Sequence, residues 1–171
     1  MNINPTMAAI LGLLHSGPMT GGQVNEMAQK WLSPYWNVTR SQVYRELPYM
    51  ESLGFVKSGK SGPRNSLPYQ ITASGKRRFK VWLKESPAPD AIRSESLLRI
   101  SFGHLMEDGG LPSLLEKMRE EHEAALENIR LLSKEAADGE MIYDRKVLKF
   151  MYGYHASAIR WLHMVSFPTE E

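Results

Sequence analysis

The chain has 171 residues, which is enough for one ordinary domain or two small ones. Hydrophobic residues make up 42% and charged residues 23%, a composition typical of globular proteins and not of disordered ones. There is no cysteine, which excludes disulfides, thiol catalysis and thiolate zinc sites. The N-terminal sequence MNINPTMAAILGLLHSG has no basic leader and its apolar run is too short to span a membrane, so we expect a cytoplasmic protein.

The net charge of +2 hides a strong asymmetry between the two halves of the chain. Residues 1–84 carry 11 Lys and Arg against 3 Asp and Glu, whereas residues 85–171 carry 10 against 16. The first half is therefore +8 and the second −6. A basic half is typical of a domain that binds a polyanion such as nucleic acid, although a basic face can also simply be solvated.

Two short helices are predicted at the start of the chain. Asn4 followed by Pro5 has the form of a helix start, with a capping side chain and proline at the first helical position. Gly17-Pro18 ends this helix. Thr20 and Gln23 have the spacing of a capping box, in which each side chain bonds to the other residue's backbone, and they open the second helix.

A third helix opens with the same spacing at Thr39 and Gln42. Its apolar residues recur at steps of three and four: Val43, Leu47, Met50 and Leu53. Pro48 lies inside this pattern, where a proline costs about 3 kcal/mol because it removes a backbone donor and clashes with the preceding turn. Since the apolar residues keep their phase across Pro48, we predict one kinked helix and not two.

A β-hairpin follows the third helix. Residues 55–57 and 67–71 have the pattern of two strands, and Pro68 is acceptable in the second if that is an edge strand. Between them, SGKSGPRNS is a polar and basic tip. The sequence therefore predicts a small wing with a cationic end.

Thr72 can cap a fourth helix, in which Phe79 and Leu83 are expected to pack inward. The basic run over residues 76–80 is either the solvated face of this helix or an additional contact with phosphate. The order of helix, helix, helix, hairpin and helix is that of a winged helix-turn-helix.

Pro87-Ala88-Pro89 breaks the chain. We therefore predict a winged helix-turn-helix DNA-binding domain over residues 1–86 and a helical domain, for dimerisation and possible effector binding, over residues 87–171. A helix is expected over residues 92–107. The long helix after it has a stripe of apolar residues and one histidine: Leu111, Leu115, Met118, His122, Ala125, Ile129, Leu132 and Ala136.

The last helix carries two adjacent stripes. The first consists of Val147, Met151, Tyr154, Ala158, Trp161 and Val165. The second consists of Leu148, His155, Ile159 and Leu162. Because one stripe per helix satisfies an antiparallel hairpin, the extra width predicts a further partner, most simply a second copy of the chain. We name the first stripe as the dimerisation surface.

In a winged helix-turn-helix the third helix enters the major groove and the wing meets phosphate or the minor groove. The expected DNA-binding residues are Thr39, Arg40, Ser41, Gln42, Tyr44, Arg45, Lys60, Arg64 and Asn65. Arg40 and Gln42 can form paired hydrogen bonds with guanine or adenine edges, and Ser41 can bond several bases or phosphates. Tyr44, Arg45 and the wing residues suit phosphate. We expect Pro48 to set the angle at which the first turns meet the groove.

No motif supports catalysis or a metal site. None of the histidines forms the pair, four residues apart and beside a glutamate, that a zinc-hydrolase helix requires. Gly21-Gly22 lacks the Lys-Ser/Thr of a phosphate loop, and no Gly-x-Ser-x-Gly elbow occurs. We therefore expect no enzyme, no cofactor and no metal. His122 can instead specify the register of its helical seam.

Four segments carry a family resemblance: ILGLL (10–14), GPMTGGQV (17–24), WNVTRSQVYRELPYMESLGFV (36–56) and YQITASGKRRFKVWL (69–83). They resemble the PadR family of transcriptional regulators and cover almost all of the first half. The second half resembles the longer helical C-terminal region of that family in pattern only. The resemblance implies a homodimer that binds an inverted repeat in double-stranded DNA, commonly as a repressor and sometimes released by a small aromatic ligand.

The expected fold is thus mainly α with a small β-hairpin wing. An effector pocket would involve Tyr152 and His155, with Tyr154 and Trp161 beside them, unless these side chains are buried dimer core. An alternative of another class is a dimeric helical interaction protein whose basic wing binds an acidic protein partner. This alternative predicts no binding to the DNA upstream of the chain's own gene. A third interpretation is an enzyme with a histidine metal site.

Overall fold

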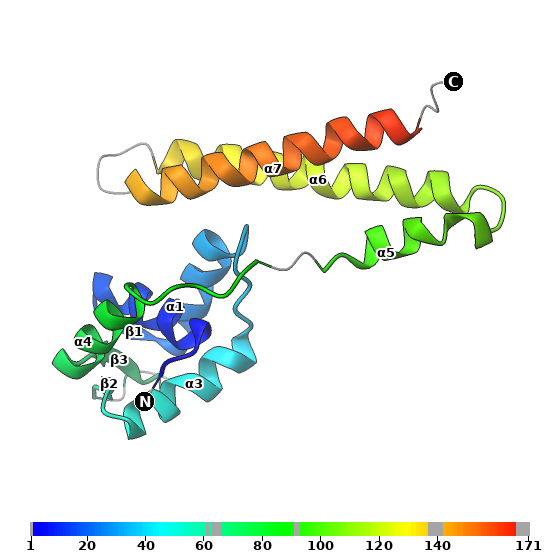
Figure 1. The fold of residues 1–171 in the computed structure, drawn as a ribbon. Coiled ribbons are helices and arrows are strands. Elements are labelled where there is room, and N and C mark those ends of the chain that lie inside the picture. The colour runs from blue at the N-terminus through cyan, green and yellow to red at the C-terminus, as the bar shows by residue number, and fades with distance from the viewer. Residues whose placement is uncertain (1, 61, 63–65, 91–92, 137–141, 167–171) are drawn as a thin grey trace. The chain divides into compact units, whose positions relative to one another are not determined.

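The computed structural model describes residues 2–60, 62, 66–90, 93–136 and 142–166 (Figure 1). The chain forms two compact units, Met1–Ala88 and Pro89–Glu171. The division lies close to the boundary expected from the Pro-Ala-Pro sequence. Among the described residues, no helix is both long and apolar enough to cross a bilayer.

The first unit contains the three helices expected at the start of the chain. They are α1 (Pro5–Leu13), α2 (Gly21–Met27) and α3 (Arg40–Ser52), with short helical turns η1 (Leu14–Ser16) and η2 (Ala28–Leu32) after the first two. Asn4 caps α1, since its Oδ1 accepts the backbone N–H of Met7 at 2.8 Å. Both predicted capping boxes form, at the starts of α2 and α3. The helix α3 continues through Pro48, so the prediction of one helix is confirmed.

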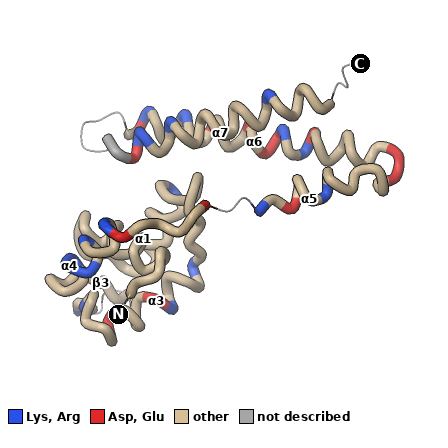
Figure 2. Tube along the Cα trace, viewed as in Figure 1, with Lys and Arg blue, Asp and Glu red and all other residues tan. Residues whose placement is uncertain are grey.

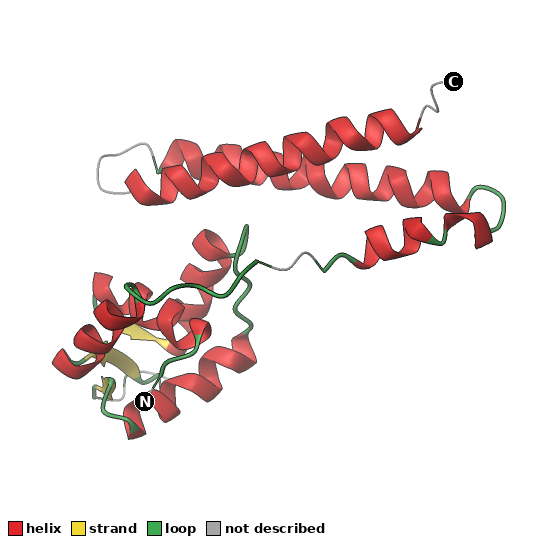
Figure 3. Ribbon diagram, viewed as in Figure 1, coloured by secondary structure: helices red, strands yellow, loops and turns green. Residues whose placement is uncertain are grey.

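A three-stranded antiparallel sheet completes the wing (Figure 3). Its strands are β1 (Met19–Thr20), β2 (Val56–Ser58) and β3 (Pro68–Ile71), and β3 lies in the middle. The expectation that Pro68 lies in an edge strand is therefore wrong. Pro68 is tolerated because it is the first residue of β3, where a missing N–H removes little of the ladder, and its carbonyl still accepts the Gly59 N–H at 2.7 Å.

The helix α4 (Ala73–Trp82) packs its apolar side on the core of the first unit. Gly75 lies close to the backbone that follows α3. A Cβ at this position would lie 2.1 Å from the carbonyl oxygen of Phe55, so the contact requires glycine. Phe79 packs inward as expected, but Leu83 is 60% exposed, which corrects the prediction for it. The helix ends at Trp82, and it is the Trp82 ring that packs against the core, stacked on Phe79 with centroids 6.2 Å apart.

The buried interior of the first unit is one continuous apolar cluster formed by all three N-terminal helices and two strands. Its members are Ile3, Met7, Ala8, Ile10, Leu11, Leu14, Val24, Ala28, Val38, Val43, Leu47, Met50, Val56 and Ile71. Val43, Leu47 and Met50 are at most 1% exposed, so the inward face of α3 is fixed on both sides of Pro48. The outward face of α3 is left to solvent and to any ligand.

The second unit consists of α5 (Glu95–Ser101), the short turn η4 (Gly103–Leu105), α6 (Gly110–Glu135) and α7 (Ile142–Ser166). The helix expected over residues 92–107 is shorter and breaks at Phe102, and residues 91–92 lie outside the described residues. The long helices α6 and α7 lie along each other as a hairpin (Figure 1). Its buried side chains are Leu115, Met118, Ile129, Leu132, Ala136, Leu148 and Leu162, which confirms the stripe predicted for α6.

Candidate nucleic-acid interface

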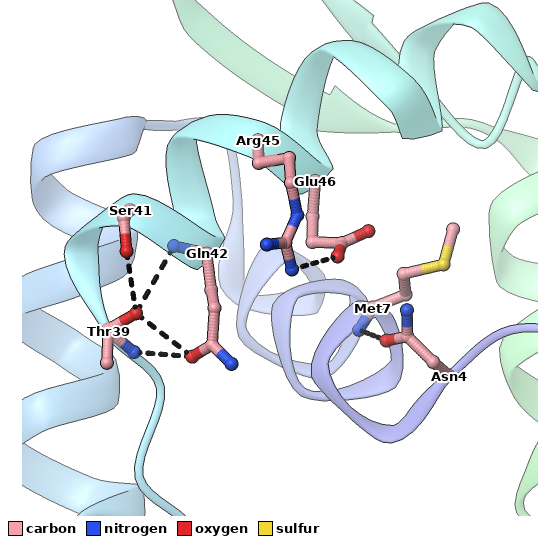
Figure 4. A network of polar contacts seen from close by, with 7 residues as sticks. All are labelled: Asn4, Met7, Thr39, Ser41, Gln42, Arg45 and Glu46. Carbon is pink, nitrogen blue, oxygen red and sulfur yellow. Dashed lines mark hydrogen bonds and ion pairs between the residues drawn. The ribbon is translucent and has the colours of Figure 1, made fainter.

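A closed set of hydrogen bonds holds the start of α3 (Figure 4). The Thr39 N–H donates to Gln42 Oε1 at 2.8 Å, and the Gln42 N–H donates to Thr39 Oγ1 at 3.3 Å. The Thr39 hydroxyl also lies 3.1 Å from Gln42 Oε1 and 3.1 Å from Ser41 Oγ. Because a helix start leaves backbone donors open, these bonds fix the first turn of α3. The predicted base-reading residues therefore project from a rigid turn.

Tyr44 joins α3 to the start of α2. A Cβ on Gly21 would come within 3.2 Å of the Tyr44 ring, tighter than ordinary contact, so the ring packs where Gly21 has no side chain. A Cβ on Gly22 would stay 3.8 Å or more from its neighbours. The Arg40 guanidinium lies 5.4 Å from the centroid of the Tyr44 ring, a cation–π distance. Tyr44 thus supports Arg40 and remains 49% exposed itself.

Arg45 is positioned by a buried carboxylate. Its Nη2 donates to Glu46 Oε1 at 3.0 Å, and the Arg45 side chain is 68% exposed whereas that of Glu46 is 7% exposed. A guanidinium has five N–H donors, so one bond to Glu46 leaves the others available for a phosphate. Among the described residues, Glu46 is a buried charged side chain. Its contact with Arg45 is not predicted by the sequence.

The wing is tied to the far end of α3 by Glu51. The Ser58 N–H in β2 donates to Glu51 Oε1 at 2.6 Å. Hydrogen bonds from the Ser58 side chain and backbone lower the pKa of Glu51 below its ordinary value, against a weaker effect of burial. Burial and the nearby Glu51 charge raise the pKa of Tyr69 in β3. The carboxylate is thus charged at neutral pH and fixes the angle between α3 and the wing.

Of the wing residues expected to bind DNA, Lys60 is described and exposed, and Arg64 and Asn65 lie outside the described residues. Lys and Arg are spread along α4 (Figure 2). Lys76, Arg77 and Lys80 are exposed, whereas Arg78 donates to Asn2 Oδ1 at 2.7 Å and to Glu85 Oε1 at 3.1 Å. Arg78 is therefore used inside the first unit, whereas the side chains of the other three are exposed.

Comparison with known proteins identifies relatives of both units. A family model described as virulence activator alpha C-term matches residues 92–165, in the second unit. Over 126 residues the chain is 26% identical to the negative transcriptional regulator PadR of Bacillus subtilis strain 168, across 71% of this chain and 69% of that protein. PadR-like transcriptional regulators are its homologues. These homologues are transcriptional regulators, a non-enzymatic family, which confirms the expectation that the chain is not an enzyme.

Solved structures extend the likeness to nearly the whole chain. A PadR-like regulator from Bacillus cereus has a TM-score of 0.84 at 19% identity, covering 94% of this chain and 95% of that one. Bacillus subtilis PadR in complex with operator DNA has a TM-score of 0.81 at 21% identity, covering 97% and 98%. The same protein in complex with p-coumaric acid has a TM-score of 0.73 at 22% identity, covering 96% of each chain. The predicted fold class, mainly helical with a small wing, is confirmed.

The dimerisation stripe predicted from the sequence lies along α7. Of its residues, Tyr154 is 49% and Val165 41% exposed, and the remaining four are partly buried: Val147, Met151, Ala158 and Trp161. The neighbouring stripe makes the hairpin contact, since Leu148 and Leu162 are buried. Trp161 also packs against the cluster around Leu115, Met118 and Leu162, so this ring serves the hairpin as well.

The two residues predicted for an effector pocket have different neighbours on α6. His155 Nδ1 lies 2.8 Å from His122 Nδ1, and Tyr154 packs edge-on against both rings. The Tyr152 ring instead lies 5.8 Å from the Arg130 guanidinium. Burial lowers the pKa of His122 and of His155, and for His155 the nearby His122 adds to this lowering. Within the described residues, Tyr152 and His155 therefore do not converge on one space.

The pair of His122 and His155 is a feature that sequence reasoning missed. The sequence predicts that His122 specifies the register of its helical seam. The only signal in the sequence for its contact with His155 is that His155 belongs to the second apolar stripe of α7. In the part of the chain that the structure describes, no group of three or more His, Asp or Glu is arranged to hold a metal ion.

Proposed function

We propose that this chain is a sequence-specific transcriptional regulator that binds operator DNA through α3 and the wing. The observation that carries the proposal is the start of α3, where capped backbone, Arg40 on Tyr44, and Arg45 beside Glu46 present exposed polar side chains at fixed positions. Arginine and amide groups at the start of such a helix can contact base edges and phosphates in the major groove. The complex of Bacillus subtilis PadR with operator DNA supports this assignment.

We further propose that the chain acts as a homodimer on an inverted repeat, and as a repressor. The partly exposed stripe on α7 supports association of two copies, and a twofold dimer calls for a twofold operator. The word negative in the name of the Bacillus subtilis relative supports repression. Release by a small aromatic ligand is part of the same proposal, supported by the p-coumaric acid complex of that relative.

The test is a mobility-shift assay on the DNA upstream of the chain's own gene, at two salt concentrations. Arg45→Ala should weaken binding to every duplex and reduce the salt dependence by about one phosphate contact, because Arg45 is expected to neutralise a phosphate. Gln42→Ala should instead relax the preference for the specific site. Lys149→Ala, an exposed cation on α7, is the matched control and should change neither quantity.

Footprinting on the same DNA, repeated with p-coumaric acid and other aromatic acids, tests the inverted repeat and the release. An affinity that does not change with salt would contradict the electrostatic part of the proposal. No retardation of upstream DNA, together with binding to an acidic protein, would support the alternative of a protein-interaction module.

A further inference from the structure

The capping network at the start of α3 fixes which way the Gln42 amide faces. A backbone N–H can only donate, so the Gln42 atom that lies 2.8 Å from the Thr39 nitrogen must be the oxygen. The orientation of this amide therefore follows from the chemistry of its partner. In Figure 4 the amide nitrogen lies on the side of Gln42 away from Thr39.

The same network uses the acceptor capacity of that oxygen. An amide oxygen has two lone pairs, and Gln42 Oε1 lies 2.8 Å from the Thr39 nitrogen and 3.1 Å from the Thr39 hydroxyl. Thr39 Oγ1 in turn accepts the Gln42 backbone N–H and has Ser41 Oγ 3.1 Å away. Ser41 can supply a proton to Thr39, which leaves the Thr39 proton for Gln42.

The amide nitrogen of Gln42 is left with two N–H donors. No hydrogen bond joins Nε2 to any residue that the structure describes, although the oxygen of the same amide is bound twice. Nε2 belongs to the first turn of α3, on which the neighbouring Ser41 and Arg45 are exposed (Figure 4). If the Gln42 amide meets DNA in this orientation, it offers two N–H donors and no acceptor.

We propose that Gln42 reads the operator as a hydrogen-bond donor only. Its targets are then base-edge acceptors in the major groove, namely purine N7, guanine O6 and thymine O4. The paired contact with adenine that the sequence suggested is excluded, because it needs the oxygen to accept from the adenine amino group while that oxygen caps α3. This inference rests on the proposed binding of DNA by α3.

The variant that tests the inference is Gln42→Glu. Glutamate is an equally good third member of a capping box, so it keeps both acceptor bonds to Thr39 while it removes the N–H donors and adds a negative charge. The matched control is Gln23→Glu, in the box where the Thr20 N–H donates to Gln23 Oε1 at 2.9 Å. For each protein, the ratio of affinities for the footprinted duplex and for a shuffled duplex is measured, which cancels the general repulsion of an added charge.

Gln42→Glu is expected to lower this ratio by roughly five- to tenfold, the effect of one hydrogen bond, while the thermal unfolding of the protein is unchanged. Gln23→Glu should leave the ratio within about twofold of the wild type. If Gln42→Glu leaves the ratio unchanged, Gln42 reads no base and the inference is overturned. If the wild type does not prefer the footprinted duplex at all, it is the proposed function that fails.

Base analogues then separate donor from acceptor readout. The footprinted duplex is substituted, one position at a time, with analogues that lack an acceptor: 7-deazapurines for N7, 2-aminopurine for guanine O6 and 5-methyl-2-pyrimidinone for thymine O4. Purine deoxyriboside replaces adenine to remove its amino donor. We expect at least one acceptor deletion that weakens the wild type and leaves Gln42→Glu unaffected. If removal of an adenine amino group weakens the wild type and leaves Gln42→Glu unaffected, the inference is overturned. That result would show that Oε1 leaves Thr39 to accept from the base.

Discussion

The two units of this chain differ in how completely they cover their own apolar surface. In the first unit, one cluster that runs from Ile3 to Ile71 is buried, and exposed Tyr44 has the Arg40 guanidinium as a partner. Its exposed aliphatic side chains include Val81 and Leu83 at the end of α4, at 50% and 60%. In the second unit, large aliphatic and aromatic side chains remain uncovered: Leu105 is 73%, Phe150 72% and Met164 66% exposed.

The reason for this difference is geometric. Three helices and a sheet enclose a volume, whereas two long helices bury only the seam between them and leave their other apolar faces open. The first unit therefore presents polar groups from a rigid surface, and the second leaves apolar faces that the proposed association of two copies would cover. The predictions below test this contrast, and they run from the largest expected effect to the smallest.

The largest effect is expected for a charge placed in the dimerisation stripe. If two copies associate through this stripe, as proposed, Ala158→Glu would bury an unpaired carboxylate between them, so we expect a monomer in analytical ultracentrifugation. Affinity for the operator should fall by about a hundredfold or more, because two linked half-sites are no longer bound together. The control is Ser157→Glu, on the neighbouring exposed position. A dimer that survives Ala158→Glu would mean that two copies meet through a different face.

Gly21 tests how tightly the first unit is packed around Tyr44. Gly21→Val places a Cβ 3.2 Å from the Tyr44 ring, and overpacking of this kind costs about 1–3 kcal/mol of unfolding free energy. Chemical denaturation should show this loss, and the double variant with Tyr44→Ala should recover part of it. Gly22→Ala, whose Cβ meets only ordinary contacts, should be tolerated. Equal losses at both glycines would show that helix flexibility, and not contact with Tyr44, sets the cost.

Pro48 tests whether the geometry of α3 serves recognition. Pro48→Ala restores a helical N–H that can bond the Tyr44 carbonyl, so we expect it to stabilise the first unit by about 1 kcal/mol in denaturant unfolding. If Pro48 bends α3, as the sequence predicts, and this bend sets the angle of the first turns, operator affinity should fall a few-fold, by roughly 1 kcal/mol, at the same time. Greater stability with unchanged affinity would show that the bend is incidental to DNA binding.

The smallest effect is expected from the pair of His122 and His155 in the second unit. Burial lowers both pKa values below the ordinary 6.5, so the unfolded chain binds more protons than the folded one below about that pH. The contribution of the pair is therefore complete above about pH 6.5 and declines as the pH falls toward the lowered values. A bond between two Nδ1 atoms also needs one ring to lack a proton there, so full protonation breaks it.

The measurement is the melting temperature at about pH 7.5 and about pH 5.5, chosen to bracket the ordinary histidine pKa. His155→Phe should reduce the pH dependence of the wild type, and His104→Gln, at an exposed histidine outside the hairpin, should not. Glu121 acts on His122 in the opposite direction, so Glu121→Gln should enlarge the loss at low pH. An unchanged slope in His155→Phe would assign the acid sensitivity to other groups.

Much of the recognition surface follows from local chemistry that a sequence displays directly. Asn4, Thr20, Thr39 and Thr72 cap helices because a short polar side chain before a helical pattern satisfies open backbone donors, and this rule needs no knowledge of the rest of the fold. The continuity of α3 through Pro48 follows from the phase of three buried residues. The stripes of α6 and α7 follow from helical periodicity in the same way.

Contacts between segments distant in sequence were decided only by the tertiary structure. The strand β1 has two residues, too few for a periodic pattern, and it forms because β3 offers an open edge; that pairing moved Pro68 from an edge strand to a central one. The bonds of Glu51 to Ser58 and of His122 to His155, and the packing of Tyr44 on Gly21, join positions whose distance depends on how elements pack. The local sequence determines which types of side chain lie at the start of α3. Which of their donors and acceptors remain free depends on the three-dimensional hydrogen-bond network around them.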